Sequence, residues 1–404
     1  MTKIRTNIIT PVNPESADFL PDHVLGIETG KIVLIEPYDP ETHKDYQDKS
    51  DMVCLPGLID LHVHLSQYDI RGLYRPALLP WLNDIVFPEE EKSADTSYAK
   101  PLARRFLEGL LREGTTTSVI YTAPYKEACE AAFETAQSMG VRAIIGMTLM
   151  DMNSPRRMQQ TTDYAVQNSI EMFHKWSKSG LLDYIFTPRF APTCSEAMMR
   201  VIGRFAHDNN ARIQTHLSEN RDEIAWVQKI FGLESYTDVY REYGILGKNT
   251  IMAHCIHLSD REMNMLAETD TRIAHCPDSN FYLKSGEYPL LKIKQHGIAY
   301  GLGSDVGAGT TVNMFYHAKM YNFRQMSIPI LPADALYHIT LGAAKVLNME
   351  DRIGSVEIGK EADLIFLNNP SPDTSGMSDL LSQLVFFGHE FALREVYTAG
   401  NRLI

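Results

Sequence analysis

The chain has 404 residues, of which 44% are hydrophobic and 22% are charged, and this composition excludes a largely disordered protein. Its formal net charge of -13 argues against a protein that binds nucleic-acid phosphates, because such proteins concentrate Lys and Arg. The five cysteines form no C-x-x-C pair, so we expect no disulfide framework and favour a cytoplasmic location. No signal-peptide core and no run of ~20 apolar residues is found, so we also expect no membrane association.

Both ends of the chain have the alternating pattern of apolar and polar residues that is typical of short β-strands separated by turns. At the N-terminal end we predict strands at 7–11, 23–28 and 30–35, followed by an acidic, polar loop before Val53. Residues 354–367 and 396–404 show the same pattern near the C-terminal end. We therefore predict that residues 1–54 and 353–404 pair into one small β-sandwich domain.

Between these ends, strand and helix patterns alternate. Eight strand candidates occur, at 58–65, 116–121, 142–148, 184–189, 212–217, 250–254, 272–275 and 299–304. Amphipathic helix patterns occur at 99–113, 125–139, 170–178 and 196–209, with Gly114, Gly140 and Gly180 placed to end helices. Eight such units predict a (β/α)8 TIM-like barrel, of the α/β class, over residues 55–352.

Four of the predicted strands end in residues that can bind a metal or transfer a proton. Side chains alternate along a strand, so His62 and His64 share one face of the first strand. The others are His216, with Glu219 just beyond it, His254 and Asp305. Because strand ends converge in a parallel barrel, this pattern indicates a transition-metal site. The irregular segment from Gln67 to Tyr98 follows the first pair and is predicted to form a wall of the pocket.

These motifs resemble the amidohydrolase superfamily, and the resemblance covers essentially the whole chain. It implies that the metal ligands are His62, His64, His216 and Asp305. It also implies that His254 orients the water that the metal activates. Members with two metals generally use a lysine from the fourth strand, and residues 181–190 contain none, so we expect one metal per chain. Zinc is the default, and Fe²⁺ is an alternative because imidazole and carboxylate ligands suit both ions.

A narrower resemblance is to the guanine-deaminating branch of this superfamily. It is carried by the segments His64–Tyr68, Pro188–Phe190, His216–Glu223, His275–Asn280 and Gly301–Val306. It implies a homodimer that converts guanine, a small purine, to xanthine and ammonia. In that reaction Asp305 would take a proton from water, and Glu219 would protonate the ring and the departing amine.

The same resemblance points to three substrate contacts. Arg189 could donate a fork of hydrogen bonds to the adjacent O6 and N7 acceptors of guanine. Phe190 could stack on the purine plane, and Gln67 could read a further polar edge.

Other interpretations stay open at this point. Cys255 and Asp278 depart from the usual family pattern, so the substrate could be another aminopurine, a pterin or a triazine. A non-enzymatic barrel scaffold is disfavoured because the full ligand set and Glu219 are present.

Overall fold

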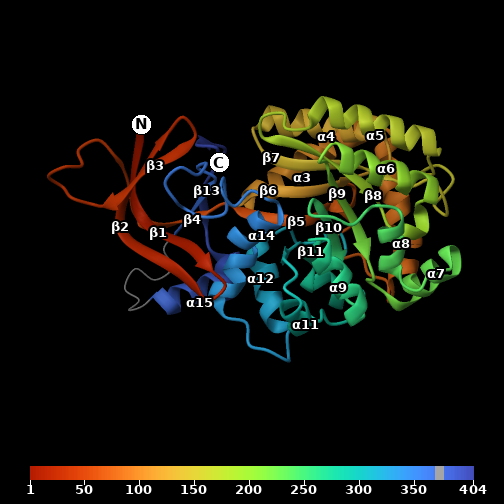
Figure 1. Cartoon of the computed structure of the whole chain (residues 1–404). Coiled ribbons are helices and arrows are strands. Elements are labelled where there is room, and N and C mark those ends of the chain that lie inside the picture. The colour runs from red at the N-terminus through yellow and green to blue at the C-terminus, as the bar shows by residue number, and fades with distance from the viewer. Residues whose placement is uncertain (369–376) are drawn as a thin grey trace.

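Eight parallel strands form the larger of two sheets in this computed structural model, which describes residues 1–368 and 377–404 (Figure 1). They follow one another in chain order: β5 (Leu58–His64), β6 (Thr115–Thr122), β7 (Arg142–Leu149), β8 (Leu182–Pro188), β9 (Arg212–Leu217), β10 (Thr250–His254), β11 (Arg272–His275) and β12 (Tyr300–Leu302). The two ends of the sheet meet where Asp305 N donates to His62 O and His64 N donates to Val306 O, each at 2.8 Å. The predicted (β/α)8 barrel is confirmed.

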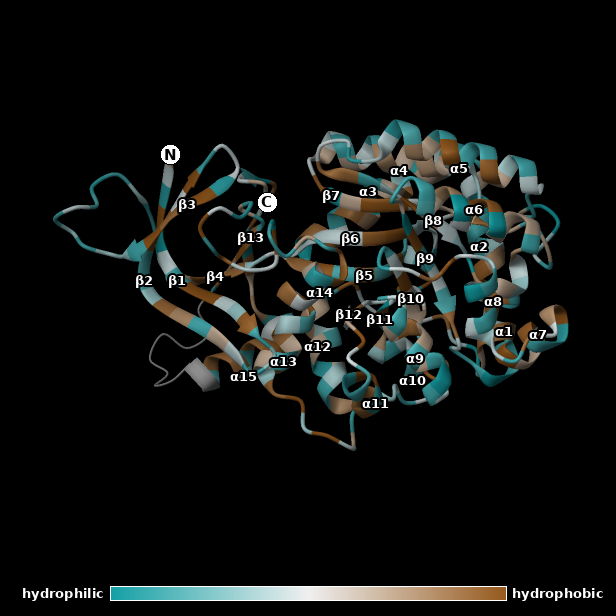
Figure 2. Ribbon diagram, in the orientation of Figure 1, coloured by the Kyte–Doolittle hydropathy of each residue, from teal (hydrophilic) through white to brown (hydrophobic). Residues whose placement is uncertain are grey.

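Helices follow the barrel strands and bury one apolar face each. The longer ones are α3 (Thr96–Arg112), α4 (Lys126–Met139), α5 (Thr162–Trp176), α6 (Glu196–Asp208), α7 (Arg221–Phe231), α8 (Tyr236–Glu242), α9 (Asp260–Glu268) and α12 (Met314–Phe323). The shorter ones are α10 (Pro277–Tyr282), α11 (Leu290–Gln295), α13 (Pro332–His338) and α14 (Leu341–Val346). On α3, buried residues recur at three- and four-residue spacing, from Ala99 to Leu111. Figure 2 shows the resulting mixture of hydrophilic and hydrophobic positions on these helices.

The helix ends follow from local capping. Gly140 ends α4 with φ 68°, a left-handed conformation that glycine adopts without steric cost. Helix α5 begins earlier than the predicted residue 170, because the side chain of Thr161 accepts a hydrogen bond from the Tyr164 N–H and caps the first turn. The apolar pattern alone had marked only the C-terminal half of that helix.

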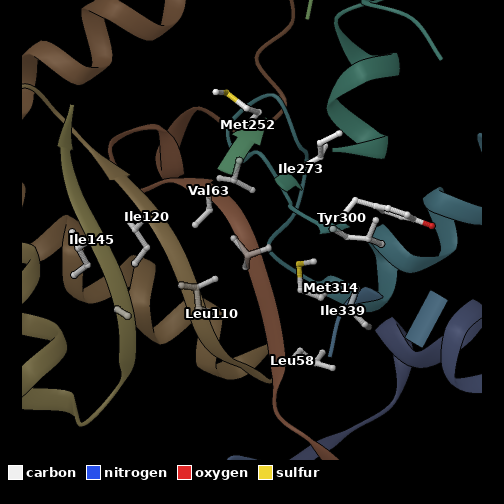
Figure 3. Packing of buried hydrophobic residues seen from close by; sticks show 14 of the residues in the cluster. Leu58, Val63, Leu110, Ile120, Ile145, Met252, Ile273, Tyr300, Met314 and Ile339 are labelled. Atoms are coloured by element: carbon white, nitrogen blue, oxygen red, sulfur yellow. The ribbon is translucent and has the colours of Figure 1, made fainter. Parts of the chain in front are cut away.

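The hydrophobic core fills the space between the strands and the helices around them. Figure 3 shows part of it, with Leu58, Val63, Ile120 and Ile145 on barrel strands and Leu110 reaching in from α3. All five of these side chains are fully buried. Among the described residues, no helix has the length and apolar character needed to traverse a lipid bilayer.

The second sheet combines both ends of the chain, as predicted. Its strands are β1 (Thr2–Asn13), β2 (Ser16–Glu28), β3 (Lys31–Pro37), β4 (Gln47–Pro56), β13 (Leu364–Asn368), β14 (Leu393–Thr398) and β15 (Asn401–Arg402). Strand β4 pairs with β1 on one side and with β13 on the other. The strands therefore form one hydrogen-bonded series of seven to which both ends of the chain contribute. Helix α15 (Met377–Phe387) lies between β13 and β14 in the chain.

The prediction of a polar loop before Val53 was wrong over residues 47–51, because these residues belong to β4. Most of these residues are exposed, so their polarity gave no apolar alternation. Lys49 is the buried exception, and its ammonium group pairs with Glu395 of β14. A buried ion pair thus occupies the inward-facing position of β4 where an apolar side chain would normally be found.

One buried arginine connects the two sheets. Arg142, at the start of β7, donates to Asp363 at 2.8 Å and to Glu361 at 2.5 Å. Both Arg142 and Asp363 have side chains that are 2% exposed. The segment before β13 is therefore fixed to the barrel by charge-assisted hydrogen bonds.

The segment after the first histidine pair is more regular than we predicted. It consists of short helical turns: η1 (Leu65–Ile70), α1 (Leu78–Trp81), η2 (Leu82–Val86), α2 (Phe87–Glu91) and η3 (Lys92–Ala94). The apolar side chains of Leu78, Trp81, Leu82, Val86 and Phe87 are buried in one cluster. This packing holds the segment against the carboxyl end of the barrel.

Candidate active site

Three strand ends bring four polar side chains to one point. His62 and His64 come from β5, His216 from β9, and Asp305 follows β12. The ligand atoms of these four residues lie within 4.8 Å of one another. The two Nε2 atoms of His62 and His64 are 3.2 Å apart, and Asp305 Oδ1 is 3.1 Å and 3.2 Å from them.

This arrangement fits a single bound metal ion. Two nitrogen ligands on a tetrahedral zinc ion stand ~3.3 Å apart, given metal–nitrogen distances of about 2.0–2.1 Å. Two buried imidazoles (His62 and His64), one half-buried imidazole (His216) and one buried carboxylate are a donor set that zinc and iron both accept. The Nδ1–H of His216 donates to the backbone carbonyl of Arg189 at 2.7 Å, which leaves Nε2 free to bind the ion.

The protonation states also suit metal binding. Burial lowers the pKa of His62 to about 4 and the pKa of His216 well below its usual value, so both rings are neutral near pH 7. Burial alone would raise the pKa of Asp305, but hydrogen bonds from His62 and His64 hold it well below its usual range. Neutral imidazoles and an ionised carboxylate are the forms that coordinate a cation.

His254 and Glu219 lie together beside these four residues. His254 Nε2 lies 3.5 Å from Glu219 and 3.8 Å from Asp305. Its Nδ1–H donates to Asn280 at 2.9 Å, which fixes the ring. Burial raises the pKa of Glu219 to about 7, although the nearby His254 partly opposes this shift. A carboxyl group that titrates near neutrality can both donate and accept a proton.

A strained backbone conformation recurs at the same strand ends. Ser218, His254, Cys255 and Asp305 all have positive φ, between 50° and 69°. Residues with side chains adopt this conformation at a cost, and such positions gather at functional sites. The strain turns the chain sharply after β9, β10 and β12.

A small cavity of about 30 Å³ opens beside the candidate metal site. It is lined by His64, Gln67, Leu78, Trp81, Leu82, Arg189, Phe190, His216, Glu219, Glu223, His254, Leu283 and Asp305. All three predicted substrate contacts are in this set. The segment after the first histidine pair supplies Gln67, Leu78, Trp81 and Leu82, so it forms part of the pocket wall as we predicted.

Arg189 is held in a buried ion pair inside this wall. Its Nη1 donates to Glu90 at 2.5 Å, and the Glu90 side chain is 1% exposed. The guanidinium also lies 5.2 Å from the centre of the Phe87 ring. Phe190 is buried, and its ring meets Trp226 edge-on with centroids 6.1 Å apart.

Sequence reasoning missed Glu90 and Glu223. No local signal distinguishes Glu90 from the neighbouring carboxylates of the acidic run at 89–91. Glu223 did carry a signal, because Asn220 and Glu223 have the spacing of a capping box. In the structure, Glu223 accepts hydrogen bonds from the Glu219 and Asn220 N–H groups, at 3.0 Å and 3.1 Å, and thereby supports the loop that carries Glu219.

Two other histidines near these strand ends lie outside the four-residue group. His257 Nε2 donates to the Ser285 carbonyl at 2.8 Å. His275 stacks on Tyr288, with ring centroids 4.0 Å apart. A second possible ligand group contains Cys276 and shares His62 and Asp305 with the first, so it overlaps that site and does not form a separate one.

Comparisons with known proteins agree with this geometry. The sequence profile of the amidohydrolase family matches residues 53–403. The guanine deaminase of Escherichia coli (strain K12) is 38% identical over 413 residues, covering 96% of this chain and 93% of that protein. The solved structure of the E. coli guanine deaminase superposes with a TM-score of 0.95 and 33% identity, covering 100% of this chain and 99% of that one.

A crystal structure of guanine deaminase from C. acetobutylicum, with guanine bound in its active site, is also similar. It has a TM-score of 0.94 and 30% identity, and each chain is covered over its full length. Similarity of this extent spans both sheets and every residue of the candidate site. The chain therefore belongs to the amidohydrolase family.

Proposed function

We propose that this chain is a metal-dependent guanine deaminase, which hydrolyses guanine to xanthine and ammonia. The observation that carries the proposal is one cavity lined both by His64, His216 and Asp305 of the four converging residues and by Arg189, Phe190 and Gln67. Relatives across the whole chain are named guanine deaminases, and one similar structure holds guanine in its active site.

The four converging residues, His62, His64, His216 and Asp305, would hold one divalent ion, with zinc as the first choice and Fe²⁺ as the second. When bound, such an ion supplies Lewis acidity that makes water a nucleophile near neutral pH. Asp305 would accept a proton from the attacking water, and His254, whose Nε2 lies 3.8 Å from Asp305, would orient that water.

Glu219 completes the reaction at the leaving group. Its protonated form donates to a ring nitrogen as water adds to C2 of guanine. The ionised form then receives the remaining hydroxyl proton of the adduct and passes it to the amino group, and the proton held by Asp305 returns to Glu219, which restores both carboxyl groups. The C2–N bond breaks, ammonia leaves, and a carbonyl remains at C2, so atoms and charge balance.

Recognition of the far edge of the purine is assigned to Arg189. Nη1 is its one hydrogen-bonded nitrogen within the described residues, so the other N–H groups are available to two adjacent acceptors such as O6 and N7. Adenine would present an amino donor at this edge and should be rejected. Phe190 packs against the base, and Gln67 contributes a polar contact.

The decisive experiment is ammonia release from a panel of aminopurines, pterins and triazines, with metal content measured on the same preparation. We expect guanine to be turned over far faster than the others by protein that carries about one metal ion per chain. Faster turnover of a pterin or triazine would replace the substrate assignment. Unchanged guanine turnover in Arg189→Ala would refute the role of the arginine.

Other features of the proposal concern the protein as a whole. We infer a homodimer in the cytoplasm that acts on a small purine and binds neither nucleic acid nor membrane. We also retain the division into a catalytic domain, residues 55–352, and a second domain from residues 1–54 and 353–404. Residues 369–376 of that second domain lie outside the described part of the chain. Light scattering of the purified protein tests the dimer.

A further inference from the structure

One carboxylate connects the two polar side chains assigned to substrate recognition. Glu90 Oε1 accepts a hydrogen bond from Gln67 Nε2 at 2.8 Å, and Glu90 Oε2 accepts one from Arg189 Nη1 at 2.5 Å. Exposure is 1% for Glu90, 2% for Gln67 and 3% for Arg189. All three side chains are thus held away from bulk water, at the wall of the cavity.

This contact fixes the orientation of Gln67. An ionised carboxylate only accepts hydrogen bonds, so the amide nitrogen of Gln67 must face Glu90. The amide oxygen then faces the Gly307 N–H, which donates to it at 3.2 Å. Without Glu90, the two ends of the amide could exchange places.

The same contact fixes the guanidinium of Arg189. Glu90 holds one end of the group, and the Phe87 ring, also on α2, lies beside it at 5.2 Å. A fork can read two adjacent acceptors only when its plane is fixed, because both hydrogen bonds depend on direction. Burial of the pair also removes the water that would otherwise compete for these N–H groups.

We propose that Glu90 is a positioning residue for substrate specificity, which aims Arg189 at the O6/N7 edge of a 6-oxopurine and holds Gln67 in place for its own polar contact. The inference rests on the proposed function, because guanine is the substrate that presents this edge. It gives α2, which supplies none of the residues that line the cavity, a role in recognition. Glu90 itself does not contact the purine.

The test uses two ligands that cannot be deaminated because they lack the 2-amino group. Hypoxanthine presents O6 and N7 as guanine does, and 7-deazahypoxanthine replaces N7 by carbon. Their dissociation constants are measured by titration calorimetry on metal-loaded wild type, Glu90→Gln and Glu89→Gln. Glu89→Gln is the matched control, since Glu89 is the adjacent carboxylate and contacts Lys92 and Tyr98 instead.

We expect Glu90→Gln to weaken hypoxanthine binding about tenfold or more, the amount that loss of a bidentate contact implies. Binding of 7-deazahypoxanthine should change much less, because N7 is already absent. Glu89→Gln should resemble wild type with both ligands. An equal loss for both ligands, or no loss for either, would overturn the inference, as would the same selective loss in Glu89→Gln.

A second variant covers the case in which Glu90→Gln does not fold. Glu90→Asp keeps the charge but cannot reach both partners, so it should show the same selective loss to a smaller degree. Wild-type discrimination in Glu90→Asp would count against the inference. If the wild type discriminates between the ligands and releases no ammonia from guanine, the proposed function fails while the positioning role stands.

Discussion

A Glu219→Gln substitution tests the proposed proton transfer with little change in shape. In the structure this carboxyl lies 3.5 Å from His254 and accepts a hydrogen bond from Ser285 at 3.2 Å, and an amide oxygen can accept the same bond. Burial raises the pKa of Glu219 to about 7, so both of its protonation states are populated at neutral pH. Glutamine can neither release nor receive the proton, so the whole general acid–base contribution should be lost.

That contribution is about 10²–10⁴-fold in rate, or about 3–5 kcal/mol in activation free energy. The assay is ammonia release at saturating guanine, normalised to bound metal. Metal content should match the wild type, because Glu219 is not among the four converging ligands. The control is Glu262→Gln, a buried capping-box glutamate outside the cavity, which should keep kcat near the wild-type value. A Glu219→Gln enzyme with kcat within about tenfold of wild type would refute the assigned role.

Three further predictions follow from the site and the second sheet. His216→Ala should lose bound metal, whereas His254→Gln should keep the metal and lose turnover; equal metal loss by elemental analysis would contradict this division of roles. Lys49→Met should lower the melting temperature at pH 7, because Glu395 loses its buried cationic partner and keeps only the exposed Arg402. Burial would raise the pKa of Glu395, but Lys49 and Tyr397 hold it below the usual 4.5, so this stabilisation is present above about pH 4.5. The difference between wild type and variant should therefore shrink as the pH falls further, and a constant difference would disprove the linkage. Arg142→Met should reduce the free energy of unfolding by about 3–5 kcal/mol, because Asp363 loses its buried partner. Denaturant titration measures this change. A change near zero would show that other contacts join the two sheets.

The barrel could be predicted from the sequence because its signals are local. Each strand is a short apolar run before a polar residue, and each predicted helix repeats its apolar residues at helical spacing. The histidine pair at 62 and 64 shares one face through the two-residue period of a strand, which needs no tertiary information. Once eight strands are expected, barrel geometry brings their carboxyl ends together, and this predicts which distant residues meet.

The sequence by itself thus determined the order of the barrel strands and the candidate metal ligands. Only the tertiary structure showed that residues 47–51 form a strand, because their partners come from β1 and from the far end of the chain. It alone also showed that Glu90 meets Arg189 across 99 positions of sequence. Local patterns report which face of an element is buried, whereas the partner of a buried charge is set by how separate elements pack.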